Sequence, residues 1–147
     1  MTLRRILTIA AFLVLTFAPL PAQVTAPRLA NEAAEAGQWL MYSGSYRSHR
    51  FSPLTQISAN TVGHLRPVWV YQPPGSGALE STPVVADGVM YVTAGPASVV
   101  ALELKSGRPL WEWSRPIPAA VRNLGFPRAN RGVAILGDTI YVGTLDA

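Results

Sequence analysis

The stretch "ALELKSGRPLWEW", residues 101–113, places a small residue, a Ser-Gly pair and two tryptophans at short intervals between apolar runs. The runs "SVVALEL" and "PLWEW" have the length and the β-branched or aromatic content of strands. The four residues Lys105-Ser106-Gly107-Arg108 separate them and have the composition of a turn. The stretch therefore predicts an antiparallel hairpin.

A second hairpin precedes this one. The apolar runs "TPVVA" and "VMYVTA" are separated by Asp87-Gly88, a dipeptide that tolerates the positive φ of a two-residue turn. Together the two hairpins predict one antiparallel meander. Its four strands are expected over Thr82–Ala86, Val89–Ala94, Ser98–Leu104 and Pro109–Trp113.

We call the hairpin over Thr82–Ala94 the inner hairpin and the one over Ser98–Trp113 the outer hairpin. The inner hairpin recurs later in the chain. "VVADGVMYVT" resembles "AILGDTIYVG", and the alignment places Tyr91 on Tyr141, a shift of 50 residues. A four-stranded unit that repeats at about 40–50 residues is typical of a β-propeller blade. Tandem hairpins in a sandwich are the alternative, but they do not require a second tryptophan in register. Here Trp69 in "LRPVWVYQP" resembles Trp111 in "GRPLWEWSRP".

The fold class expected is all-β: a partial β-propeller of about two four-stranded antiparallel blades. Residues 66–147 form the start of this propeller, and "RPVWVY" is expected to supply the outer strand of the last blade. The part after residue 22 holds about two and a half repeats, fewer than the roughly four blades of a closed ring. We therefore expect the chain to be truncated.

The first 65 residues have a different character. Residues 1–22 combine Arg4 and Arg5, an apolar run and a small-residue end, the plan of a signal peptide cleaved after Ala22. An uncleaved anchor is the alternative, but the apolar run is short against the ~20 residues that span a bilayer. Residues 23–65 are expected to form an N-terminal segment with a short helix in "RLANEAAEAGQ", Arg28–Gln38. The protein is expected to be exported, for example to the periplasm.

Composition excludes several functions. Hydrophobic residues make up 49% of the chain and charged residues 14%, which suits a packed domain. The chain contains no cysteine, so it has no disulfide and no thiolate metal site. Without Arg4 and Arg5, ten basic residues face eight acidic ones. We therefore expect no binding to nucleic acid.

The residues of the outer hairpin carry a resemblance to a known family. The series Ala101, Glu103, Ser106, Gly107 and Trp111 resembles the tryptophan-docking repeat of the pyrroloquinoline quinone (PQQ) dehydrogenases, which runs Ala, Asp or Asn, Thr, Gly, Trp. Glu103 and Ser106 are mild departures from this pattern. The resemblance implies that each indole fills the gap between adjacent blades, that the alanine admits it and that the glycine makes the turn.

The resemblance extends to "WLMYSGSYRSHRFSPLTQI", "ESTPVVADGVMYVT" and "NRGVAILGDTIYVGTLDA". It implies two cofactor contacts: Glu80 matches a glutamate that hydrogen-bonds PQQ, and Arg131 matches the arginine that pairs with it. The shift of 50 residues places Glu80 on Asn130, so both contacts are expected at the same edge of successive blades. A planar guanidinium suits the three carboxylates and the ortho-quinone of PQQ. The alternatives are an exposed acid at a strand end and a solvated loop arginine.

The resemblance also implies chemistry that this chain does not carry. Many members have two adjacent cysteines where Gly125 and Phe126 stand here. Phe126 either stacks on the cofactor or packs in its loop. The Ca²⁺ ligands and the catalytic aspartate lie later in the family, so no catalytic or metal-binding residue is assigned, and Asp138 and Asp146 are not used as substitutes.

The function implied is that of the N-terminal part of a quinoprotein dehydrogenase. Such an enzyme oxidises an alcohol or a sugar and passes the electrons to a cytochrome c or a membrane quinone. The isolated piece is expected to be inactive. The alternatives are a non-enzymatic propeller of the outer-membrane assembly type and a pseudoenzyme, but a scaffold has no need of an acid and a guanidinium beside the channel.

Overall fold

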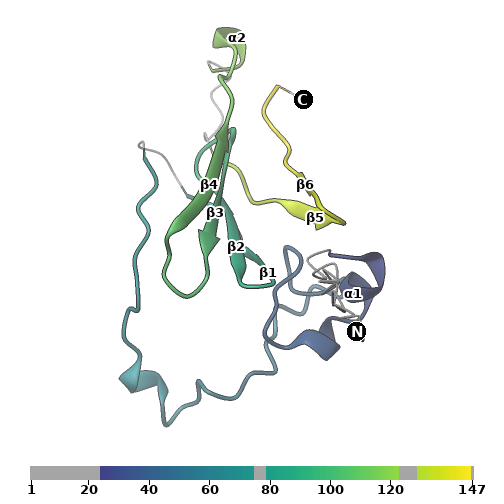
Figure 1. The fold of residues 1–147 in the computed structure, drawn as a ribbon, viewed down its shortest axis with the longest axis vertical. Coiled ribbons are helices and arrows are strands. Elements are labelled where there is room, and N and C mark those ends of the chain that lie inside the picture. Colours follow the sequence, from purple (N-terminus) through teal and green to yellow (C-terminus); the bar gives the residue numbers. More distant parts are fainter. Residues whose placement is uncertain (1–23, 75–78, 123–128, 147) are drawn as a thin grey trace, which may run out of the picture.

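The computed structural model describes residues 24–74, 79–122 and 129–146 (Figure 1). The predicted signal peptide, residues 1–22, lies outside them. Within the described ranges, two short α-helices and two 3-10 helices accompany six strands. In chain order they are α1 (Ala26–Ala30), η1 (Glu32–Glu35), η2 (Val62–His64), β1 (Val84–Ala86), β2 (Val89–Thr93), β3 (Ser98–Glu103), β4 (Pro109–Ser114), α2 (Ala119–Arg122), β5 (Ala134–Leu136) and β6 (Thr139–Tyr141).

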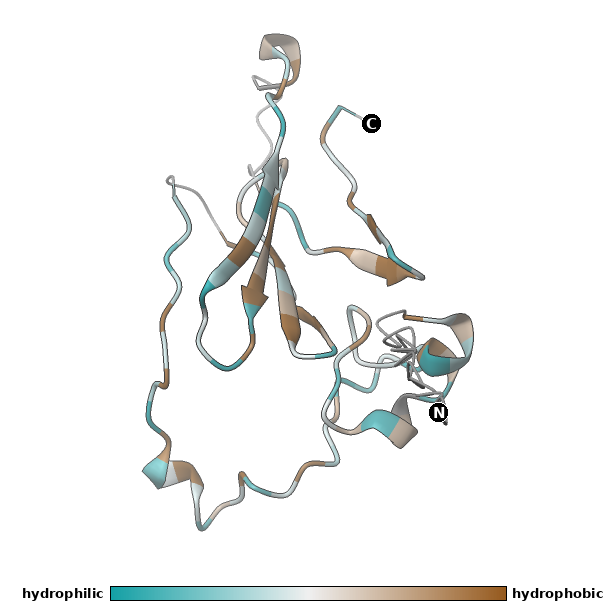
Figure 2. Cartoon of the chain, in the orientation of Figure 1, coloured by the Kyte–Doolittle hydropathy of each residue, from teal (hydrophilic) through white to brown (hydrophobic). Residues whose placement is uncertain are grey.

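The first sheet is the predicted meander. Its strands lie in the order β1-β2-β3-β4, and every neighbouring pair is antiparallel. Apolar residues concentrate in the inner strands, as Figure 2 shows. From Val99 to Leu102 no residue of β3 is more than 2% exposed, whereas every residue of β4 is exposed. The outer strand is therefore an edge that the described residues leave uncovered.

The second sheet repeats the inner hairpin of the first. Strand β5 pairs with β6 so that Ala134 lies opposite Tyr141, just as Val84 lies opposite Tyr91 in the first sheet. All three cross-strand pairs of the two hairpins correspond at the shift of 50 residues. This common register confirms the predicted repeat. Within the described ranges the second sheet has two strands rather than four.

Both hairpin turns rely on positive φ. In the first, Asp87 has φ +51° and Gly88 has φ +82°. A two-residue turn with positive φ at both positions twists with its strands, and aspartate followed by glycine is a preferred sequence for it. The predicted two-residue turn is confirmed.

A row of three side chains explains the small residue in the outer hairpin. Ala101 lies directly opposite Tyr91 on one side and Trp111 on the other. Directly opposed residues point to the same face of a sheet. The rings of Tyr91 and Trp111 meet over the alanine, with centroids 6.0 Å apart and planes tilted by 48°. A larger side chain at position 101 would push the two rings apart.

The indole of Trp69 lies on the turn between β3 and β4. Its Nε1 donates a hydrogen bond to the carbonyl oxygen of Leu104 at 3.0 Å. A Cβ added to Gly107 would lie 2.4 Å from Cε3 of this indole, so the ring rests directly on the glycine backbone. The segment 66–71 pairs with no strand among the described residues. The blade that it is predicted to complete is not among them either, so this outer strand stays a prediction. The contact of the Trp69 indole with the Gly107 turn is a finding of the structure that the sequence did not predict.

The short helix predicted within Arg28–Gln38 is present, but it begins earlier and is broken. The segment forms α1 and η1, separated at Asn31, which has φ −124° and ψ 55°. Helix propensity is a weak prior that tertiary contacts override. Here two backbone pairings fix the chain on either side of the break. Val24 pairs with Gly137, and Trp39 pairs with Val85 on the free edge of β1.

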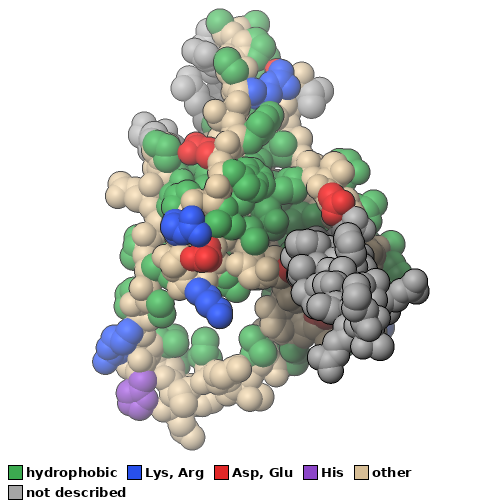
Figure 3. All heavy atoms as spheres, in the orientation of Figure 1, with side chains coloured by type: hydrophobic (Ala, Val, Ile, Leu, Met, Phe, Trp, Pro, Cys, Tyr) green, Lys and Arg blue, Asp and Glu red, His purple; other side chains and the backbone are tan. Residues whose placement is uncertain are grey.

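The N-terminal segment contributes to a core that it shares with both sheets (Figure 1). Val24, Leu29 and Leu40 are at most 8% exposed. They cluster with side chains from β1, β3 and the second hairpin. Outside this core, large apolar side chains remain on the surface, and Figure 3 shows them gathered over the middle of one face. The core thus ties the inner hairpins of both sheets to residues 24–41.

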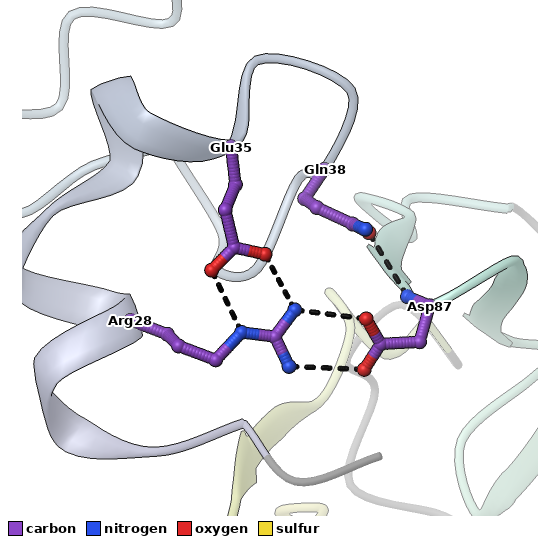
Figure 4. A network of polar contacts seen from close by, with 4 residues as sticks. All are labelled: Arg28, Glu35, Gln38 and Asp87. Carbon is purple, nitrogen blue, oxygen red and sulfur yellow. Dashed lines mark hydrogen bonds and ion pairs between the residues drawn. The ribbon is translucent and has the colours of Figure 1, made fainter. Parts of the chain in front are cut away.

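An ion-pair network fastens the N-terminal segment to the first hairpin turn (Figure 4). The guanidinium of Arg28 donates to both carboxylate oxygens of Glu35, at 2.8 and 2.6 Å, and to both of Asp87, at 2.9 Å each. The amide oxygen of Gln38 accepts from the backbone N–H of Asp87 at 2.9 Å. The hydrogen bond and charge of Arg28 lower the pKa of Glu35 below its ordinary value.

We expect Arg28→Met to destabilise the protein by about 1–2 kcal/mol at neutral pH, because Glu35 loses a bidentate, partly buried pair of bonds and Asp87 loses a bidentate, exposed pair. The pKa of Glu35 is lower in the folded state than in the unfolded state. Its contribution is therefore complete above the ordinary glutamate pKa of 4.5 and is lost as the pH falls through the folded value. Urea unfolding at several pH values measures this. The difference from wild type should shrink below about pH 4.

The control is Arg108→Met, which breaks the more exposed pair of Arg108 with Glu103 at 3.6 Å. This variant should lose less stability than Arg28→Met. Equal losses in the two variants, or an Arg28→Met loss that does not change with pH, would contradict the role assigned to the network.

Candidate functional site

The two predicted site residues meet at one rim of the structure. Glu80 precedes β1 and Arg131 precedes β5, so both lie at the strand ends opposite the Asp87 turn and the N-terminal segment. The Nε atom of Arg131 lies 3.4 Å from Oε2 of Glu80. The repeat alignment placed them at equivalent edges of successive blades, and the structure brings their side chains together there.

The backbone around Arg131 is held from several sides. Its carbonyl oxygen accepts a hydrogen bond from the N–H of Thr82 at 3.0 Å. The side chain of Asn130 donates from Nδ2 to the carbonyl oxygen of Gly143 at 2.6 Å, and its Oδ1 accepts from the N–H of Gly132 at 3.0 Å. These bonds connect the segment that precedes β5 to the residues that follow β6 and to those that precede β1.

The side chains at the rim are far more exposed than the backbone that carries them. The side chain of Arg131 is 77% exposed and that of Glu80 is 39% exposed. Their contact uses Nε and one carboxylate oxygen, and no other described side chain forms a hydrogen bond or ion pair with either. An exposed pair of this kind adds little stability. It leaves the Nη groups of the arginine and a carboxylate oxygen of the glutamate available to a ligand with acidic and polar groups.

The other candidate positions do not add a cofactor or metal site. Gly125 and Phe126 lie outside the described residues. Asp146 accepts hydrogen bonds from Thr144 and Arg115, and the Thr144 hydroxyl is the main cause of its lowered pKa.

Among residues 24–74, 79–122 and 129–146, no three His, Asp or Glu side chains cluster as a metal site would require. No helix in those same ranges has the length and apolar content to cross a bilayer.

The sequence profile of the PQQ β-propeller domain of glucose, ethanol and alcohol dehydrogenases matches residues 39–145. The chain belongs to this family. The match includes both sheets, the segment 66–71 with Trp69, and the two rim residues Glu80 and Arg131. The fold is accordingly part of a PQQ β-propeller, with the first sheet as one blade and the second hairpin as the inner part of the next.

Individual members of the PQQ dehydrogenase family are similar over most of the chain. It is 38% identical over 132 residues to a quinoprotein ethanol dehydrogenase from Pseudomonas aeruginosa, and 39% identical over 114 residues to a 1-butanol dehydrogenase (cytochrome c) from Thauera butanivorans. These alignments cover 88% and 77% of the chain, but 21% and 16% of the relatives. The chain therefore spans about a fifth of their length.

A solved structure agrees with these relatives. The quinohemoprotein alcohol dehydrogenase ADH-IIG of Pseudomonas putida superposes with a TM-score of 0.77 at 36% identity. The superposition covers 86% of this chain and 19% of that one.

Sequence reasoning missed two residues of the rim, Thr93 and Asn130. Thr93 ends β2 and is 2% exposed, and its Oγ1 donates to the carbonyl oxygen of Asn130 at 3.0 Å. A signal for both was present. Thr93 is a polar residue at the end of an apolar run, and Asn130 aligns with Glu80 at the shift of 50 residues. Their pairing joins positions 37 residues apart and could not be read from spacing.

Proposed function

We propose that this chain is part of an exported PQQ-dependent dehydrogenase and contributes Glu80 and Arg131 to its cofactor pocket. The observation that carries the proposal is the contact between these two residues, which come from successive blades and meet at one rim. Bound PQQ supplies the redox chemistry, because its quinone accepts the hydride of the substrate. The guanidinium pairs with a carboxylate of the cofactor, and the glutamate accepts a hydrogen bond from it.

The remaining parts of the proposal concern the whole protein. Its substrate is an alcohol, the class named in both relatives, with a sugar as the second choice because the family description includes glucose. Its electron acceptor is a cytochrome c, as in the name of the Thauera relative, or a membrane quinone. The leader pattern of residues 1–22 supports export to the periplasm. Ca²⁺ and the catalytic base are assigned to residues beyond this chain, which alone should be inactive.

The test measures PQQ affinity in the whole protein, prepared without cofactor, by quenching of tryptophan fluorescence. Arg131→Gln and Glu80→Gln should each weaken binding by about 10- to 100-fold, because each removes a charge-assisted bond to the ligand. Arg131→Lys should recover only part of the affinity, because an ammonium lacks the planar pair of donors.

Matched controls change the same charges elsewhere. Arg66 binds only backbone carbonyl oxygens of its own segment among the described residues, and Glu112 lies on the exposed face of β4. Arg66→Gln and Glu112→Gln should leave the affinity within about twofold of wild type. Equal effects of control and rim variants, or no PQQ binding by the wild type, would refute the proposed function.

A further inference from the structure

Thr93 connects the two sides of the rim. Its hydroxyl donates to the carbonyl oxygen of Asn130, the neighbour of Arg131, at 3.0 Å. Its backbone N–H donates to Oγ of Ser81, the neighbour of Glu80, at 2.9 Å. One residue of β2 is therefore bonded to the residues next to both members of the ion pair.

Because Thr93 is buried, its hydrogen bonds strongly constrain the position of the Asn130 backbone. Thr93 is 2% exposed, and a buried hydroxyl without a partner would be costly. The Asn130 carbonyl is therefore held in place from the first blade, although Asn130 itself belongs to the second. The bond from the N–H of Thr82 to the carbonyl oxygen of Arg131 runs between the same two blades.

The contact between Glu80 and Arg131 cannot provide this order by itself. It is a single contact of 3.4 Å between largely exposed side chains. Holding a long arginine side chain in one geometry costs conformational entropy that such a pair barely offsets. The placement of the guanidinium at the rim must therefore come from its backbone, which the hydroxyl of Thr93 helps to fix.

We infer that Thr93 is a positioning residue for the cofactor site: its hydroxyl holds the Asn130-Arg131 backbone so that the guanidinium faces Glu80 before the cofactor binds. The inference rests on the proposed function, since it concerns the same site. A site that is ordered in advance binds more tightly because less order is lost on binding.

The experiment compares Thr93→Val with Thr93→Ser in the cofactor-free whole protein, with PQQ as the titrant. Valine keeps the shape and removes the donor, so PQQ affinity should fall about three- to tenfold. Serine keeps the hydroxyl and should restore the affinity to within about twofold of wild type. Thermal unfolding of the same samples verifies that each variant is folded.

The decisive measurement is a double-mutant cycle with Arg131→Ala. If Thr93 acts through the arginine, Thr93→Val should change PQQ affinity in the wild type and have almost no effect when Arg131 is absent. A merely structural role would lower affinity equally in both backgrounds, and that result would overturn the inference. If Thr93→Val does not fold, Ser81→Ala breaks the other bond at a half-buried position, and the same cycle with Glu80→Gln applies to it.

The outcomes separate the inference from the proposed function. No PQQ binding by the wild type, or no effect of Arg131→Ala, removes the proposed function. Tight wild-type binding that depends on Arg131 but is indifferent to Thr93→Val removes only the positioning role. Loss with valine, recovery with serine and coupling to Arg131 support it.

Discussion

Gly107→Ala is expected to destabilise the protein by about 3–5 kcal/mol, because two penalties coincide at this turn. The glycine has φ +70°, a conformation that strains an L-residue. The new methyl would also lie 2.4 Å from Cε3 and 2.5 Å from Cδ2 of the Trp69 indole. The ring must move away, which breaks its hydrogen bond to Leu104 and its packing on the turn.

Gly88→Ala is the matched control. Gly88 has φ +82° at the other hairpin turn of the same sheet, but a Cβ there would meet nothing within 4 Å. Both variants strain the backbone, and only Gly107→Ala displaces an indole. Urea unfolding of the whole protein should give a clearly larger loss for Gly107→Ala. Equal losses would show that the contact with Trp69 adds nothing.

A local measurement supports the global one. Trp69 is followed by Val70, and chymotrypsin cleaves after an accessible tryptophan. When the indole leaves its site, the segment 66–71 loses an anchor and opens more often. Chymotryptic cleavage after Trp69 should therefore be faster in Gly107→Ala than in wild type and unchanged in Gly88→Ala.

The hairpins could be predicted because their signals are local. Asp87-Gly88 determines a two-residue turn, and the turn length fixes which residues oppose each other. The repeat then transfers the register of the first hairpin to the second, where Ala134 opposes Tyr141 as expected. Local turn chemistry and a fixed repeat length leave few other arrangements for these strands.

The departures from the docking repeat also have a local explanation. Glu103 and Ser106 stand where the family has Asp or Asn and Thr. The hydroxyl of Ser106 donates to the carboxylate of Glu103, and Oγ of Ser106 accepts the backbone N–H of Arg108. The bond from Ser106, with the charge of Arg108, lowers the pKa of Glu103. The two substitutions thus form a bonded pair across the turn that Gly107 completes.

The break in the N-terminal helix could not be predicted because it depends on distant partners. The ion pair of Arg28 with Asp87 joins positions 59 residues apart, and the residues of "RLANEAAEAGQ" alone give no sign of it. A continuous helix would not place the guanidinium between Glu35 and Asp87 while Trp39 pairs with Val85. The break at Asn31 satisfies both requirements at the expense of helix propensity.

Gly132→Ala is the second change with a large expected effect, and it acts on the site itself. Gly132 has φ +128°, which is essentially restricted to glycine, and a Cβ there would lie 2.9 Å from the backbone oxygen of Thr82. A backbone atom cannot swing aside as a side chain can. The methyl should force the Arg131 peptide away from Thr82 and break the bond between them. We expect a loss of about 2–4 kcal/mol in stability and of about 100-fold or more in PQQ affinity.

Gly95→Ala separates the effect of backbone strain from the effect of displacing the Arg131 peptide. Gly95 has φ +110° near the end of β2, yet a Cβ there meets nothing within 4 Å. It should lose stability through backbone strain but keep its PQQ affinity, because no contact with the Arg131 backbone changes. Unfolding midpoints and PQQ titrations of both variants in the whole protein test this difference. If Gly132→Ala folds and binds PQQ as tightly as Gly95→Ala, the rim formed by Glu80 and Arg131 is not where the cofactor lies, because a ligand held by that arginine must respond to a shift of its backbone.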